Sequence, residues 1–150
     1  MTTEEMLQAV QEAFKSADAL VMAAAVADYR PVKVAEQKVK KSHDHELRTL
    51  ELTETVDILR TVAATKRTDQ LVVGFAAETE KLLDHAQEKL ASKHADMIVA
   101  NSVAGATGAF GRDDDQVTIL QKGVAPEKWP RLTKTAVAQR LVARLAEKLK

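Results

Sequence analysis

The run from Ala19 to Ala27 contains no charged residue, and Asp28 follows it at once. A strand that lacks charge throughout is typical of a parallel sheet, because helices cover both faces of such a sheet. The carboxyl ends of these strands form the edge where open α/β sheets bind their ligands. The sequence therefore predicts a buried strand over 19–27 that places Asp28 at a ligand-binding edge.

The remaining segments alternate between helical and strand-like spacing. Apolar residues recur every three or four positions, which predicts helices over 3–14, 55–64, 82–93 and 137–149. Short apolar runs predict strands over 71–75, 97–100 and 117–120, the last of them at an edge, and the segment 123–130 predicts a turn. A strand–helix–strand order requires a right-handed crossover. We therefore expect one α/β domain, with a mostly parallel, Rossmann-like sheet as the middle of three layers.

A hairpin arm is predicted between the first strand and the second helix. Residues 38–40 and 48–52 alternate at period two around the polar turn Ser42 to His45, and we place the arm at Gln37 to Leu52. An isolated hairpin is only marginally stable in water. Because Leu47, Leu50 and Leu52 add apolar surface to this arm, we expect it to mediate self-association into a homodimer.

Composition excludes several classes of function. At 150 residues the chain fits a single domain. Lysine plus arginine equal aspartate plus glutamate at 22 each, so we expect neither nucleic-acid nor membrane binding. The absence of cysteine excludes disulfides, thiolate zinc sites and a cysteine nucleophile. The acidic start and the lack of any apolar run near the roughly 20 residues of a membrane span predict a soluble, cytoplasmic protein.

Few of the charged residues indicate a site by pattern alone. Asp28 could accept hydrogen bonds from a ribose hydroxyl, or it could simply form a turn. The lysines of 38–41 point to both faces of an extended segment, where a charge run is most often a solvated surface. Lys89 and Lys93 lie four residues apart and so share a helix face, as ordinary surface lysines also do. Phe75 ends a predicted buried strand and has the character of a core aromatic residue.

The common catalytic and metal motifs are missing. No Gly-rich dinucleotide fingerprint, P-loop or nucleophile elbow is present. His43 and His45 flank Asp44 in a predicted turn without further ligands nearby, and Asp113 to Asp115 lack the spacing of a calcium loop. We therefore predict no metal-ligating residue.

Three motifs together carry a resemblance to a known family. They are the Ala-Ala-Val-Ala-Asp strand end that closes at Asp28, the Lys-x-Lys-Lys motif of 38–41, and the Gly-Phe-Ala-Ala-Glu of 74–78. As a set they resemble the phosphopantothenate–cysteine ligase of coenzyme A biosynthesis, from the first helix to the last. The family's ligase domain begins with a Gly-rich strand–turn–helix that does not precede Met1. The resemblance thus implies a single, partial ligase domain over 1–150, with the amino-terminal β–α units missing.

The resemblance implies a reaction and a site. The family makes an acyl-cytidylate from CTP with Mg²⁺, and the amine of cysteine then displaces CMP. Lys38 would be the catalytic residue and principal phosphate ligand, Lys89 and Lys93 its auxiliaries, and Asp28 a nucleotide contact. The walls of the nucleotide site would be Met22, Ala23, Ala24, Val56, Asp57, Ile58, Leu59 and Phe75. Small residues at 23–25 would let a base approach the backbone.

Other interpretations of the sequence remain open. The chain could be a nucleotide-binding module without catalysis, or an interaction module that docks through 38–52. The resemblance further implies phosphopantothenate and cysteine as substrates. It also implies a flavin-dependent phosphopantothenoylcysteine decarboxylase, either fused or as a separate partner. The preference for CTP over ATP is left open by the residues themselves.

Overall fold

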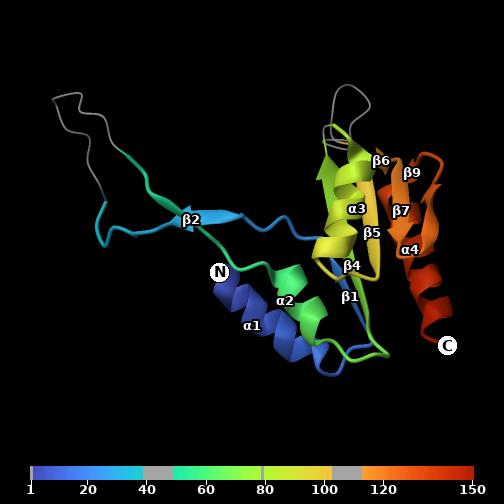
Figure 1. Cartoon of the computed structure of the whole chain (residues 1–150), viewed down its shortest axis with the longest axis horizontal. Helices are drawn as coiled ribbons and strands as arrows, with labels where there is room; N and C mark the ends of the chain where they lie inside the picture. Colours follow the sequence, from blue (N-terminus) through green and yellow to red (C-terminus); the bar gives the residue numbers. More distant parts are fainter. Residues whose placement is uncertain (1, 39–48, 79, 103–112) are drawn as a thin grey trace.

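The central feature of the computed structural model is a five-stranded sheet, and the model describes residues 2–38, 49–78, 80–102 and 113–150 (Figure 1). The strand order is β1-β4-β5-β7-β8. These strands are β1 (Ala19–Met22), β4 (Leu71–Glu78), β5 (Met97–Ser102), β7 (Val117–Gln121) and β8 (Val124–Lys128). β1, β4 and β5 run parallel, whereas β7 and β8 add to them in antiparallel fashion. The mostly parallel α/β sheet is therefore confirmed.

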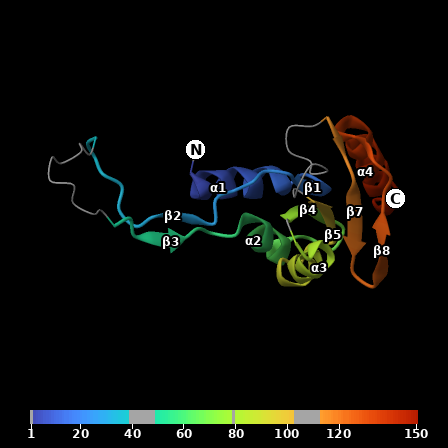
Figure 2. The same cartoon turned by 90° about the horizontal axis from the view of Figure 1, so that it is seen from above.

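Helices cover both faces of this sheet and make three layers. The helices are α1 (Thr3–Phe14), α2 (Ile58–Thr65), α3 (Leu82–Ser92) and α4 (Lys134–Lys148). One core joins α1, α2 and α3 to residues such as Val72 and Ile98, and the other joins α4 to Val73 and Val99. Neighbouring residues of β4 and β5 thus face opposite cores, as the period of a strand requires. Figure 2 shows α4 on the far side of the sheet from α2 and α3.

The register brings the strand ends to one edge. Met22 pairs with Gly74, and Gly74 pairs with Ile98. β4 and β5 continue past this row, so that Glu78 lies opposite Ser102. The carboxyl ends of the parallel strands therefore meet beside the segment that follows β1.

The predicted strand over 19–27 is wrong in its length and burial. β1 ends at Met22, and residues 23–28 are exposed apart from a half-buried Val26. β1 lies at the edge of the sheet, where β4 is its neighbour, and Val21 is 40% exposed. Among the described residues, β1 has a neighbouring strand on one side only, and the apolar run leaves the sheet where pairing with β4 stops.

A two-stranded arm projects from the body in both views (Figures 1 and 2). β2 (Tyr29–Pro31) pairs in antiparallel fashion with β3 (Leu52–Glu54). These paired strands lie nearer the body than the predicted arm of 37–52, most of which is outside the described residues. The sequence missed β2 because three residues ending in proline are too short to show a period. The predicted turn at 42–45, with His43, Asp44 and His45, and residues Lys40 and Lys41 lie outside the described residues.

Two further predictions need correction at the other side of the sheet. The strand over 117–120 is buried and lies inside the sheet, because β8 pairs along its outer side. β8 occupies the predicted turn of 123–130, and proline at 126 is compatible with an edge strand, where its missing N–H is no loss. Two residues of the acidic run Asp113 to Asp115 form a short strand, since β6 (Asp114–Asp115) pairs with β9 (Leu132–Thr133).

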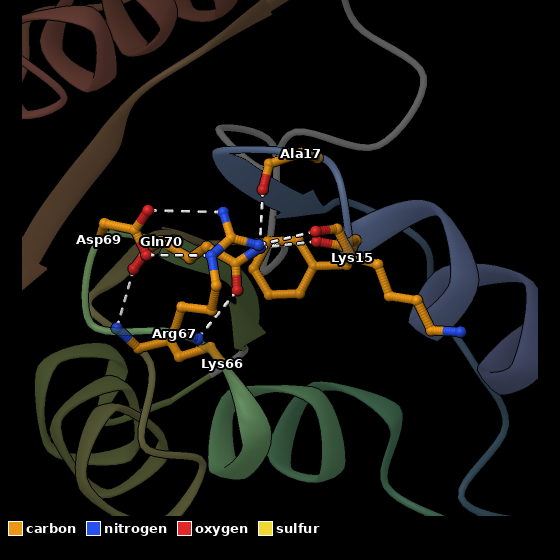
Figure 3. Close-up of polar contacts among 7 residues, drawn as sticks. Lys15, Ala17, Lys66, Arg67, Asp69 and Gln70 are labelled. Carbon is orange, nitrogen blue, oxygen red and sulfur yellow. Dashed lines mark hydrogen bonds and ion pairs between the residues drawn. The ribbon is translucent and has the colours of Figure 1, made fainter.

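A buried amide fastens the end of α1 to the loop before β4 (Figure 3). Gln70 is 2% exposed, and its Nε2 donates to the carbonyl oxygens of Phe14 at 2.6 Å and Ala17 at 2.7 Å. Arg67 Nη1 donates to the carbonyl oxygen of Lys15 at 2.7 Å. These bonds satisfy carbonyl groups that the end of a helix leaves without a partner. They fix the direction in which the chain enters β1.

Candidate functional site

A cavity of about 320 Å³ lies at the carboxyl ends of β1 and β4. The exit of β1, the entry of α2 and the inner face of α3 enclose it. The predicted site residues that line it are Met22, Ala24, Asp28, Val56, Asp57, Ile58, Leu59, Phe75, Lys89 and Lys93. Val26, Ala27, Thr55 and Ile98 complete the lining. The structure therefore gathers residues from five separate segments at the edge where open α/β sheets bind ligands.

Two predicted residues lie outside this cavity. Ala23 is exposed beside Ala24 but does not line it. Lys38 belongs to the segment 32–38, which continues the arm outward from β2 (Figure 1). The arm as described therefore does not bring Lys38 to the other predicted residues.

Larger hollows of about 1180 Å³ and 670 Å³ contain no predicted site residue. The first is bordered by Leu71, Val73 and Met97, at the amino ends of β4 and β5. That end of a parallel sheet is opposite to the usual ligand edge. The smaller cavity is the candidate site because of its position and its side chains, not its size.

Asp57 links the start of α2 to α3. Its Oδ1 accepts a hydrogen bond from the Arg60 N–H at 3.0 Å and so caps α2. Its Oδ2 accepts a hydrogen bond from Lys93 Nζ. One carboxylate thus fixes a helix terminus and a lysine ammonium on the wall of the same cavity.

Glu78 holds the other lysine of α3. Lys89 Nζ lies 2.8 Å from Glu78 Oε1, and His85 Nδ1 lies 3.2 Å from Glu78 Oε2. The hydrogen bond from Lys89 lowers the pKa of the Glu78 carboxyl, against the opposing effect of burial. Sequence reasoning missed Glu78 as a site residue, although the Gly-Phe-Ala-Ala-Glu motif contains it, because the contact joins positions eleven apart.

Two hydrogen bonds from Thr55 to backbone carbonyl oxygens hold Asp28 next to the entry of α2. The Thr55 N–H donates to the Asp28 carbonyl oxygen at 2.8 Å, and Thr55 Oγ1 donates to the Ala27 carbonyl oxygen at 2.5 Å. The segments that leave β1 and lead into α2 therefore run side by side. Their side chains form one wall of the cavity.

Gly74 lets two apolar side chains form the floor. A Cβ at this position would lie 2.5 Å from Leu59 Cδ2 and 2.9 Å from Ile98 Cδ1. Glycine at this position lets Leu59 of α2 rest directly on β4, and a larger residue would have to displace the ends of these two side chains. The next residue, Phe75, is 37% exposed and lines the cavity, so its core-like character is not what the structure shows.

Charge in the lining is balanced. Asp28 and Asp57 offset Lys89 and Lys93, so the cavity wall has no formal surplus of positive charge. Within residues 2–38, 49–78, 80–102 and 113–150, no three histidine or carboxylate side chains lie close enough to hold a metal ion. A triphosphate at this site would therefore need a further source of positive charge.

Comparison with known proteins identifies the family. The family model described as the DNA/pantothenate metabolism flavoprotein C-terminal domain matches residues 1–149. The chain belongs to this family. The cavity can therefore be interpreted by comparison with members of this family.

Relatives agree with this assignment. The chain is 39% identical over 145 residues to the coenzyme A biosynthesis bifunctional protein CoaBC of Vibrio cholerae, covering 97% of this chain and 36% of that protein. A crystal structure of the C-terminal domain of a CoaBC protein matches with a TM-score of 0.71 and 34% identity, covering 98% of this chain and 62% of that one. The chain spans about a third of the length of the curated relatives it matches.

A more distant structure shares the fold. It is a Cab2 mutant in complex with phosphopantothenate-cysteine, with a TM-score of 0.68 at 18% identity, covering 97% of this chain and 51% of that one.

In the part of the chain that is described, no helix has the length and apolar character needed to cross a membrane.

Proposed function

We propose that this chain provides the nucleotide-binding part of a phosphopantothenate–cysteine ligase that uses CTP and Mg²⁺. The observation that carries this proposal is the cavity at the strand ends, where two lysines of α3 face the exit of β1 and the start of α2. The family match and the CoaBC relatives support the same activity. The phosphopantothenate-cysteine bound to the Cab2 mutant supports phosphopantothenate and cysteine as the substrates.

The proposed reaction has two steps. The carboxylate of phosphopantothenate attacks the α-phosphorus of CTP, which forms an acyl-cytidylate and releases pyrophosphate. The amine of cysteine then attacks the acyl carbon and displaces CMP. Both steps build negative charge on phosphate oxygens, and fixed cations beside them are the expected source of rate enhancement.

Lys89 and Lys93 are suited to contact these phosphates. Each ammonium has three N–H donors, and Nζ of each lysine donates one hydrogen bond to a carboxylate, Lys89 to Glu78 and Lys93 to Asp57. Since the lining is charge-balanced, we propose that Lys38 and a Mg²⁺ ion carried on the triphosphate supply the remaining positive charge. Backbone groups near Ala24 would select the base.

Lys38 can contact the phosphates only if the arm that carries it approaches a cavity, either that of the same chain or that of a second copy. The arm exposes apolar side chains, among them Tyr29 at 58%, Val34 at 84% and Leu50 at 68%. Such surface favours packing against a second copy, so we propose a homodimer. We also propose that the protein works in the cytoplasm, together with a phosphopantothenoylcysteine decarboxylase, either fused or separate, as the bifunctional relatives suggest.

Calorimetry with CTP and ATP, each with Mg²⁺, tests the nucleotide claim. CTP should bind more tightly, because a mismatched base would leave backbone groups unpaired at about 1–3 kcal/mol each. Lys93→Met should weaken CTP binding, whereas Lys122→Met on the β7–β8 turn should not. Equal affinity for the two nucleotides would contradict base selection. The absence of binding would favour a pure interaction module.

A turnover assay separates a ligase from a binding module. Pyrophosphate release with phosphopantothenate, CTP and cysteine should stop in Lys38→Gln, introduced in a complete ligase domain, while the fold remains intact. Release at the parent rate would show that Lys38 is not the catalytic residue. CTP binding without any turnover in the complete domain would favour the non-catalytic module.

A further inference from the structure

Glu78 holds Lys89, a residue of the cavity lining, but does not itself line the cavity. Its carboxylate is 18% exposed, whereas the side chains of Lys89 and His85 are 40% and 43% exposed. Glu78 pairs with Ser102, and this is the last residue pair between β4 and β5. Glu78 is the last residue of β4, and at this point β4 is paired with β5 and no longer with β1.

Each oxygen of this carboxylate has a different partner. Oε1 accepts from Lys89 at 2.8 Å, and Oε2 faces His85 Nδ1 at 3.2 Å. Two contacts on two oxygens fix the plane of the carboxylate as well as its position. His85 and Lys89 come from successive turns of α3, so Glu78 also fastens this helix to the end of β4.

A lysine needs such a partner in order to act at a defined place. Its side chain has four rotatable bonds, so holding it in one rotamer costs conformational entropy. A carboxylate that holds the ammonium beforehand removes most of this cost from ligand binding. Asp57 does the same for Lys93 from the start of α2. The two lysines of the cavity are therefore each held by a carboxylate from a different element.

We propose that Glu78 is a positioning residue that holds Lys89 in place for the phosphates of the nucleotide, with His85 fixing the carboxylate. This rests on the proposed function. Lys89 keeps two N–H donors for phosphate oxygens while one remains on Glu78. Lys89 lines the cavity, whereas Glu78 does not. We therefore expect the gain from positioning Lys89 to exceed the repulsion between Glu78 and the phosphates.

A double-mutant cycle on CTP affinity, measured by calorimetry with Mg²⁺, tests this role. Glu78→Gln replaces the ion pair by a weaker ammonium–amide hydrogen bond and should weaken CTP binding about tenfold. In a Lys89→Met background the same change should alter affinity less than twofold. Glu88→Gln is the matched control, since it removes the same charge from an exposed position next to Lys89, and it should leave affinity unchanged in both backgrounds.

The outcomes separate the two proposals. Tighter or unchanged CTP binding in Glu78→Gln, with binding still weakened by Lys89→Met, would overturn the positioning role and leave the proposed function standing. Equal losses in both backgrounds would also overturn it, because they would reveal a general structural effect. If the unaltered chain binds no CTP, or if Lys89→Met binds it normally, the nucleotide role of Lys89 fails and the positioning role with it.

Discussion

Asp57 at the start of α2 and Lys93 at the end of α3 are 36 positions apart in the chain, yet Lys93 donates a hydrogen bond to one carboxylate oxygen of Asp57. The other carboxylate oxygen of Asp57 caps α2. The cap and the ion pair can be separated by mutation. Asparagine is as good a helix cap as aspartate, but it lacks the charge that attracts Lys93.

Asp57→Ala should therefore destabilise the fold by about 1 kcal/mol more than Asp57→Asn. The measurement is the free energy of unfolding in urea. Lys93→Met serves as the control, since it removes the ion pair and leaves the cap. If alanine and asparagine at this position cost the same, capping is not what Asp57 contributes to stability.

Gly74→Ala should change the site as well as the stability. The added Cβ must push aside the ends of Leu59 and Ile98, which both line the cavity, and overpacking of this kind costs about 1–3 kcal/mol. We expect weaker CTP binding together with a lower unfolding midpoint.

Gly123→Ala is the matched control for this change. Gly123 has a φ of +73°, and a Cβ there would meet nothing within 4 Å. The backbone strain should cost about 1–2 kcal/mol without affecting CTP affinity. A Gly74→Ala protein that binds CTP normally would show that the floor of the cavity does not contact the ligand.

The acid side of the stability profile should depend on Glu78. Lys89 lowers the pKa of this carboxyl in the folded protein. Ionised Glu78 therefore contributes stability above the ordinary glutamate pKa of about 4.3, and this contribution is lost as the pH falls through the lower folded value. Lys89→Met should raise the pKa of Glu78 in a carboxyl ¹³C NMR titration. Lys93→Met should not, because Lys93 pairs with Asp57, and an unchanged pKa in Lys89→Met would show that the contact is not formed in solution.

Self-association should depend on the arm. Val34→Lys combined with Leu50→Lys should shift the protein from dimer to monomer in analytical ultracentrifugation at micromolar concentration, because charge replaces apolar surface that is 84% and 68% exposed. Val142→Lys changes an apolar residue of α4 that is 61% exposed and should leave the dimer intact. A monomeric unaltered chain, or a dimer insensitive to the arm, would contradict the proposal.

The parts of the fold that follow a local period could be predicted from the sequence. The four helices and the strands at 71, 97 and 117 appear where apolar spacing places them. β2 and β8 were missed because short edge strands with proline carry little periodic signal. The length of β1 was overestimated, since an uncharged run does not reveal whether a strand has one neighbour or two.

The candidate site could be located but not resolved in detail. The rule that ligands bind at strand ends, together with the resemblance, was enough to bring Asp28, Phe75 and the lysines of α3 to one place. The partners of those lysines depend on contacts between distant segments, such as Asp57 with Lys93. The spacing of residues along the chain does not reveal such contacts. It also does not reveal the space that Gly74 leaves for Leu59.

The buried amide of Gln70 ties the earliest part of the chain to a much later one, at a separation of 56 positions from Phe14. During synthesis α1 is made well before Gln70, so its last carbonyl groups must stay with water until Gln70 has been added and can pack against them. Such distant contacts form late in folding. α1 is thus made before the residue that fastens its end, and its attachment to the sheet is completed late.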